Sequence, residues 1–179
     1  GDPGRLERLV RQMLAAARAE AGLYAGPDEQ VMARDLAGDV VESMLPLALS
    51  LGVEIGIGGE GDFAIEGNRA ALHGLLGNLV ENALEHSPKG AAVDVLVEGA
   101  AGTIAVADQG AGIAPALRER IFERFWSGAK PQGRQGSGLG LVIAAAIARR
   151  HEAQLSVADR PGGGALFTIA WNRLAKDKT

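Results

Sequence analysis

The clearest hydrophobic pattern in the chain runs over Leu72–Ser87, with the sequence LHGLLGNLVENALEHS. Its apolar residues recur every three or four positions, which is the spacing of a helix face packed on a core. Polar residues gather on the opposite side, and two asparagines four positions apart are neighbours on adjacent turns. The pattern predicts a buried helix that carries a polar stripe. The core positions are Leu72, Leu75, Leu76, Leu79 and Ala83, and the stripe is Asn78, Glu81, Asn82 and Glu85.

The polar stripe has two interpretations. Amide and carboxylate oxygens on adjacent turns suit a hard cation such as Mg²⁺. A stripe of this kind is equally typical of a solvated helix face. The choice between the two depends on the sequence that follows.

Similar patterns predict the other elements. Residues 5–21 are rich in helix formers, and Gly26-Pro27 reads as a break or hinge after them. A helix is predicted from about Leu36 to Leu51, and the next helix has Asn68 as its expected N-cap. Two short strands are predicted around a glycine-rich turn, Val53–Ile57 and Phe63–Glu66. Two pairs of strands are predicted around further glycine-rich turns, Val93–Glu98 with Thr103–Ala107 and Ser156–Ala158 with Leu166–Ala170. The other predictions are a strand at Val31–Ala33 and helices at Pro115–Phe125 and Leu139–Arg150.

Composition limits the classes of function. At 179 residues and 47% hydrophobic, the chain can form one core with an appendage. No apolar run approaches the ~18–20 residues of a membrane span, so the chain as given is expected to be soluble. A net charge of −4 argues against nucleic-acid binding, which needs a basic stripe. The lack of cysteine excludes a disulfide framework and a thiolate metal site.

A glycine-rich motif stands where a loop turns into the helix at Leu139–Arg150. Each glycine there costs about 1 kcal/mol relative to alanine, so three within five residues indicate that a ligand approaches the backbone. A helix N-terminus with free N–H groups is suited to phosphate. The motif does not end in the Gly-Lys-Ser/Thr of a Walker loop, and it does not match a dinucleotide-binding fingerprint. It consists of Gly136, Ser137, Gly138, Leu139, Gly140 and Leu141.

A second motif, DQGAGI, spans residues 108–113 and follows the predicted strand Thr103–Ala107. Its glycines allow a sharp bend and leave Asp108 at the end of the strand, where it can accept a hydrogen bond from a ligand amine. An ordinary strand-to-helix turn has the same local features.

Four segments now stand in order: NLVENALEHS, DQGAGI, IFERFW and GSGLGLVIAAAIARRH. Together they resemble the N, G1, F and G2 boxes of the GHKL superfamily, most closely those of the catalytic ATP-binding domain of sensor histidine kinases. The resemblance implies an α+β fold, a two-layer α/β sandwich of the Bergerat type with a mixed sheet backed by helices and an N-terminal helix. It also implies that residues 1–26 are the end of a dimerisation and phosphoacceptor domain with a hinge. Residues 27–179 would then be the catalytic ATP-binding domain.

The resemblance implies a role for each motif residue. Asn82 would be the Mg²⁺ ligand, with Asn78 beside it near the phosphates, and Asp108 would accept from the adenine amine. Trp126–Gln135 would be a lid over the phosphates. The residues implied to bind the nucleotide are Asn78, Asn82, Glu85, Asp108, Gly110, Gly112, Ile113, Phe122, Phe125, Lys130, Arg134, Gly136, Ser137, Gly138, Leu139, Gly140 and Leu141; those implied to be catalytic are Asn78, Glu81 and Asn82.

Asn78 favours a kinase over a hydrolase. ATPases of the superfamily carry a glutamate at this position, where it activates water, and an amide cannot act as a base. Phosphoryl transfer relies mainly on positioning and charge stabilisation, so a histidine kinase does not need that carboxylate. The implied function is transfer of the γ-phosphoryl of Mg-ATP to a histidine of the dimerisation domain, for relay to a response regulator in two-component signalling. A GHKL hydrolase, a serine kinase of the anti-sigma type and a non-catalytic nucleotide sensor are the alternatives.

Two positions depart from the family pattern. Glu85 stands where the family has Lys or Arg, and Ser127 stands where Arg commonly follows the RFW sequence. We hypothesise that ATP affinity is modest and depends on Lys130 and Arg134 of the lid.

The chain lacks a phosphoacceptor motif. None of its histidines, His73, His86 and His151, is followed by the acid and the Thr/Asn-Pro pair of that motif. His151 ends the last predicted helix, where a capping role is expected. The chain alone is therefore expected to bind ATP without labelling itself. The resemblance also implies a homodimeric parent in the inner membrane, with this part in the cytoplasm.

Overall fold

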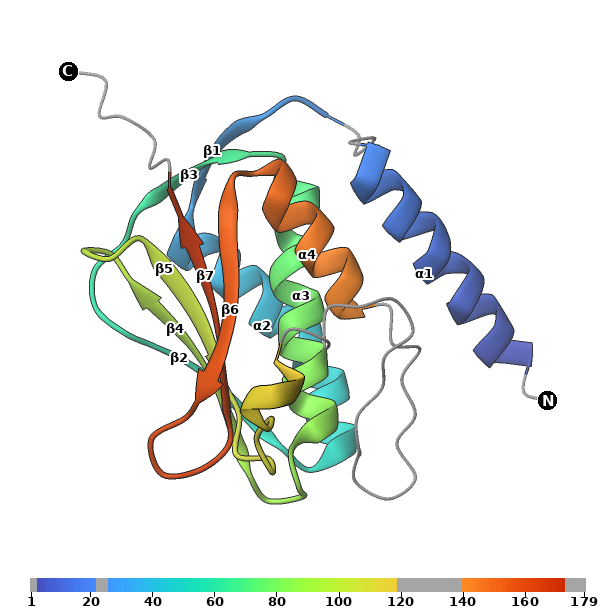
Figure 1. The fold of residues 1–179 in the computed structure, drawn as a ribbon, viewed down its shortest axis with the longest axis vertical. Coiled ribbons are helices and arrows are strands. Elements are labelled where there is room, and N and C mark those ends of the chain that lie inside the picture. The colour runs from blue at the N-terminus through green and yellow to red at the C-terminus, as the bar shows by residue number, and fades with distance from the viewer. Residues whose placement is uncertain (1–2, 22–25, 119–139, 173–179) are drawn as a thin grey trace.

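The computed structural model describes residues 3–21, 26–118 and 140–172. Along the chain, single strands or pairs of strands lie between the helices (Figure 1). The helices are α1 (Pro3–Ala21), α2 (Ala33–Leu51), α3 (Arg69–His86), the 3₁₀ helix η1 (Pro115–Leu117) and α4 (Gly140–Arg150). The strands are β1 (Glu29–Met32), β2 (Glu54–Gly58), β3 (Ala64–Gly67), β4 (Ala92–Glu98), β5 (Thr103–Ala107), β6 (Ala153–Asp159) and β7 (Ala165–Trp171).

The main layer is a mixed sheet of five strands in the order β2-β4-β5-β7-β6. β2 runs parallel to β4, and the other neighbours are antiparallel. α2, α3 and α4 cover one face of this sheet, and α1 lies outside them next to α4 (Figure 1). The expected α+β fold, a two-layer sandwich of mixed sheet and helices with an N-terminal helix, is confirmed.

β2 and β3, the two strands predicted around a glycine-rich turn, belong to different sheets. β3 pairs with β1 in a separate two-stranded sheet, whereas β2 pairs with β4. The turn between them leads the chain from one sheet to the other, and Arg34 holds it by donating to the carbonyl oxygens of Gly59 and Gly61. The prediction that Val31–Ala33 forms a strand is wrong at one end, because Ala33 begins α2.

α3 is the central helix of the core. All five predicted core positions are buried, and Val80 and Leu84 are buried as well because α2 and α4 flank the helix. Asn68 is the N-cap, as expected: its side chain accepts from the backbone N–H of Ala71 at 2.9 Å. α3 therefore holds a fixed position relative to the sheet and to α4.

The structure describes only the first part of the predicted helix at Pro115–Phe125. Its start is the 3₁₀ helix η1, and residues 119–125 lie outside the described residues.

Among the helices that the structure describes, none has both the length and the apolar character needed to cross a membrane.

Candidate functional site

The polar stripe of α3 lies against the start of α4. A Cβ atom built on Gly140 would be 3.5 Å from the side-chain oxygen of Asn78. Asn78 and Asn82 are half-buried, and neither side-chain amide makes a hydrogen bond with the described residues. Glu81 and Glu85 are half-buried too. The stripe is therefore more covered than a solvated helix face, and within the described residues no side-chain hydrogen bond occupies its two amides.

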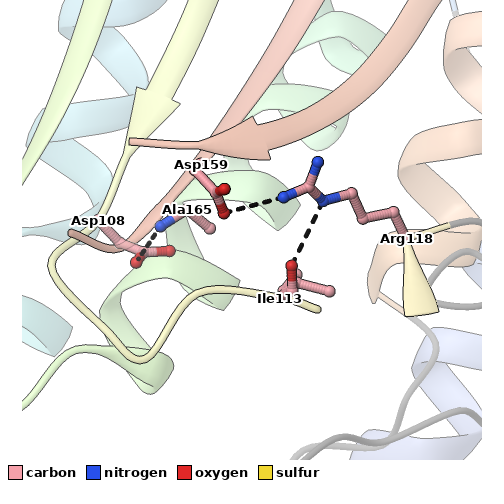
Figure 2. A network of polar contacts seen from close by, with 5 residues as sticks. All are labelled: Asp108, Ile113, Arg118, Asp159 and Ala165. Carbon is pink, nitrogen blue, oxygen red and sulfur yellow. Dashed lines mark hydrogen bonds and ion pairs between the residues drawn. The ribbon is translucent and has the colours of Figure 1, made fainter. Parts of the chain in front are cut away.

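Asp108 follows the last residue of β5, and the residue is only 3% exposed. One carboxylate oxygen, Oδ1, accepts from the backbone N–H groups of Gly110 at 2.9 Å and Ala165 at 3.1 Å. Figure 2 shows the bond to Ala165, which is the first residue of β7. The second oxygen accepts no bond from the described residues. A buried acceptor of this kind needs a partner, because leaving it unpaired costs roughly 1–3 kcal/mol.

The loop after Asp108 turns back against the end of α3. A Cβ atom on Gly110 would lie 2.6 Å from the carbonyl oxygen of His86, so only glycine fits there. Gly112 has a φ of +76° and faces the carbonyl oxygen of Gly164. Ile113 is half-buried against the core. The second motif therefore meets α3 at His86, whereas Gly140 meets the same helix at Asn78.

Two residues that the sequence patterns did not single out hold the exit of this loop. Arg118 donates from Nε to the carbonyl oxygen of Ile113 at 3.3 Å and from Nη2 to the carboxylate of Asp159 at 2.8 Å (Figure 2). Asp159 is the last residue of β6. The pair ties the end of the loop to the sheet, and no local sequence signal connects two residues 41 positions apart.

Another missed pair holds the start of the loop. Arg160 donates to the carbonyl oxygen of Asp108 at 3.2 Å and to the carboxylate of Asp94 in β4 at 2.7 Å. The sequence contains one indication of this pair: Asp94 lies within a predicted strand, and a charge there indicates that a partner lies nearby. The sequence does not identify that partner.

Of the predicted nucleotide contacts, the described structure gathers three groups around the C-terminal half of α3. These are the stripe on α3 itself, the loop from Asp108 to Ile113, and Gly140 with Leu141 at the start of α4. The remaining predicted residues, Phe122, Phe125, Lys130, Arg134, Gly136, Ser137, Gly138 and Leu139, lie outside the described residues, as does Ser127.

The donor set is compatible with Mg²⁺. The described residues contain no cluster of three or more His, Cys, Asp or Glu side chains that could hold a metal by themselves. Mg²⁺ commonly takes only one or two protein oxygens, with phosphates and waters as the other ligands. The half-buried amide oxygen of Asn82, which accepts no hydrogen bond from the residues that the structure describes, suits this mode of binding.

His151 lies at the opposite end of α4 and caps it, as expected. Its Nδ1 is 2.8 Å from the carbonyl oxygen of Ile147, and its Nε2 accepts from the backbone N–H of Asn68 at 3.3 Å. A Cβ atom on Gly67 would overlap the His151 ring. The side chain therefore joins the end of α4 to the start of α3, and its contacts are structural.

The chain is similar to known proteins along most of its length. Residues 67–175 match the family model described as histidine kinase-, DNA gyrase B- and HSP90-like ATPase. Sensor histidine kinase RppB of Synechocystis sp. is 34% identical over 170 residues, which are 92% of this chain and 37% of that protein. Swarming motility regulation sensor protein RssA of Serratia marcescens is 33% identical over 87% of this chain and 34% of that protein. The chain thus spans little more than a third of the length of these curated relatives.

Solved structures show the same likeness. The mycobacterial sensor histidine kinase MprB aligns with 80% of this chain and 96% of its own, at 26% identity and a TM-score of 0.67. Full-length ShkA in complex with AMPPNP aligns with 98% of this chain and 37% of its own, at 28% identity and a TM-score of 0.80. The chain belongs to the family of histidine kinase-, DNA gyrase B- and HSP90-like ATPases, as a catalytic ATP-binding domain of the sensor histidine kinase type.

Proposed function

We propose that this chain binds Mg-ATP and, in the whole protein, transfers its γ-phosphoryl to a histidine of the dimerisation domain for relay to a response-regulator receiver domain. The parent would be a homodimer in the inner membrane, with this domain in the cytoplasm. Residues 1–26 would be the end of the dimerisation domain and residues 27–179 the catalytic domain. The family membership, the sensor-kinase names of the relatives and the arrangement of the motifs support the proposal.

The observation that carries the proposal is the meeting of the motifs on one helix. Gly110, whose N–H donates to Asp108, approaches α3 at His86, and Gly140 approaches it at Asn78. Adenine would bind at the Asp108 end, with its exocyclic amine donating to the second carboxylate oxygen. The polyphosphate would then run along α3 towards the N-terminus of α4, where backbone N–H groups favour anions.

The chemistry assigned to the chain is positioning and electrostatics. Bound Mg²⁺ supplies charge neutralisation at the phosphates. Asn82 would hold that ion through its amide oxygen, and Asn78 would orient the phosphates beside it. Neither amide can accept a proton from water, and the lack of a base at Asn78 favours transfer over hydrolysis.

Phosphoryl transfer to a separate acceptor tests the proposal. The chain is mixed with the dimerisation domain of its own parent protein and γ-labelled Mg-ATP. We expect label on that domain that is stable to base and labile to acid, as for phosphohistidine. Release of phosphate without labelled protein would support a hydrolase, and neither product would support a nucleotide sensor.

A pair of asparagine variants makes this test specific to the site. Asn82→Ala is expected to lower the labelling rate by about tenfold or more. Asn172→Ala is the matched control, because Asn172 is exposed and follows the end of β7, which lies beside the start of β5 and so away from Asp108. Equal rates for the two variants would contradict the role of Asn82.

The lid residues are tested separately. The double variant Lys130→Ala with Arg134→Ala removes the two cations proposed to offset Glu85 and Ser127. We expect weaker ATP binding with an unchanged stability of the domain. Unchanged ATP affinity in calorimetry would contradict a role for these cations.

A further inference from the structure

Arg160 holds the main chain of Asp108 through a partly buried charge network. The Arg160 side chain is 19% exposed, and its Nη1 donates to the Asp108 carbonyl oxygen at 3.2 Å. Its Nη2 donates to Asp94 at 2.7 Å, which orients the guanidinium. Hydrogen bonds from a charged donor are stronger than neutral ones, and screening by water is reduced at partly buried sites. One side chain therefore links β4, the end of β5 and the turn after β6.

The turn that follows Arg160 acts on the same aspartate. Its backbone closes through bonds from the Arg160 N–H to Gly164 at 2.9 Å and from the Gly163 N–H to Arg160 at 3.0 Å. A Cβ atom on Gly164 would lie 2.0 Å from the Asp108 carbonyl oxygen, so the turn sits directly on that residue. The next residue, Ala165, exchanges hydrogen bonds with Asp108 on both its backbone and its carboxylate.

These contacts fix every hydrogen-bonding group of Asp108 except one carboxylate oxygen. Its N–H, its carbonyl oxygen and its Oδ1 are held by residues from 110 or from 160–165. The direction in which the remaining oxygen points therefore depends on this framework. A preorganised acceptor gives both affinity and selectivity, because no free energy is lost in ordering it when the ligand binds.

We propose that Arg160 is a positioning residue for recognition of the nucleotide base. It holds the Asp108 carbonyl, and so fixes the carboxylate where it accepts a hydrogen bond from the exocyclic amine of a 6-aminopurine. Arg160 contacts the protein and not the base. The inference rests on the proposed role of Asp108 in adenine binding.

A comparison of two nucleotides tests this role. ATP and purine riboside triphosphate, which lacks the 6-amino group, are titrated into the whole chain with Mg²⁺ present, and the dissociation constants are compared. The variants are Arg160→Met, which keeps the length of the side chain without its donors, and Arg160→Lys. Arg149→Met is the matched control, because Arg149 is exposed in the last turn of α4.

We expect the original chain to bind ATP about tenfold or more tightly than the analogue, which is the loss of affinity expected when one hydrogen bond is removed. Arg160→Met is expected to weaken ATP binding by about tenfold while leaving the analogue unchanged, so that the preference disappears. Arg160→Lys should restore part of the preference, and Arg149→Met should retain all of it. Should Arg160→Met fail to fold, Asp94→Ala is measured instead, and it should reduce the preference in the same direction.

Other outcomes overturn the inference in distinguishable ways. Equal weakening of both nucleotides by Arg160→Met, or by Asp94→Ala where it is the variant measured, would make Arg160 a structural residue only. An unchanged preference in that variant would show that Asp108 is positioned without Arg160. If the original chain binds both nucleotides equally, the proposed role of Asp108 is wrong, and the inference falls with it.

Discussion

Asp108 has one carboxylate oxygen committed to two backbone N–H groups before any ligand binds. Those groups belong to Gly110, two residues along the chain, and Ala165, which is brought in by the sheet. The carboxylate is thus held at the end of β5 in one orientation. Because water has little access to a residue that is 3% exposed, a ligand amine is a suitable partner for the other oxygen.

The substitution Asp108→Asn tests this acceptor. Its amide oxygen can still accept from both backbone N–H groups, which leaves an NH₂ donor facing the adenine amine. We expect ATP affinity to fall by about tenfold to a hundredfold, measured by calorimetry with Mg²⁺ present. Asp35→Asn, on the exposed face of α2, is the control and should bind as the original chain does. Unchanged affinity in Asp108→Asn would place the base elsewhere.

Glu152 occupies a backbone conformation that favours glycine. It follows the last turn of α4 with a φ of +54°. A side chain in this left-handed region costs roughly 1–2 kcal/mol, partly offset by the greater freedom of glycine in the unfolded chain.

We therefore expect Glu152→Gly to raise the free energy of unfolding by about 0.5–1 kcal/mol. Urea denaturation followed by circular dichroism measures the change. Glu152→Ala serves as the control, because alanine keeps the Cβ atom and so keeps the strain. A gain of equal size in Glu152→Ala would assign the effect to the loss of the carboxylate instead.

α3 is the element that serves both stability and binding. Its apolar side fills the core between the sheet and its neighbouring helices, while its polar stripe lies beside Gly140. The position of the stripe consequently depends on how firmly the helix is anchored. At its N-terminus the anchor is Asn68, which also donates from its side chain to the carbonyl oxygen of Gly26 at 3.1 Å.

The anchor is tested with Asn68→Ala. Loss of the cap leaves the Ala71 N–H unpaired at a buried position, and we expect the free energy of unfolding to fall by about 1–2 kcal/mol. Asn68→Asp keeps the cap acceptor but loses the bond to Gly26, so the difference between the variants measures the cap alone. Equal losses in denaturation curves would show that the bond to Gly26 carries the effect.

At the scale of the whole molecule, the core that the structure describes contains no side chain of α1. Every described residue of the buried cluster lies between Val31 and Trp171. Large apolar side chains of α1 remain exposed, Leu6 at 66% and Met13 at 51%. We infer that the cooperative folding unit begins near residue 26.

Removal of residues 1–25 tests that boundary and leaves the bond between Gly26 and Asn68 in place. The shortened chain is expected to keep its melting temperature within about 2 °C, because no described core residue is lost. Its ATP affinity should also stay the same. Melting followed by calorimetry provides the measurement, and a drop of about 5 °C or more would show that α1 belongs to the folding unit.

The parts that were predictable are those encoded locally. The helical period over Leu72–Ser87, the cap at Asn68 and the hairpin of β4 and β5 each depend on residues within a few positions of one another. The pairing of β2 with β4 was not predictable in this way, because α3 and β3 intervene and several strands compete for the same edge. The bond between Arg160 and Asp94 joins residues 66 positions apart, beyond any local period.

The sequence by itself determined the order of the helices and strands, the face of α3 that is buried and the set of motifs that assigns the family. These follow from periodicity, capping and glycine placement, which act over one or two turns of chain. Only the tertiary structure decided that Gly140 meets Asn78, that Gly110 meets His86, and that Arg160 holds Asp108. Such contacts depend on how the strands pair and how the helices pack over them, and that is settled by competition among distant partners.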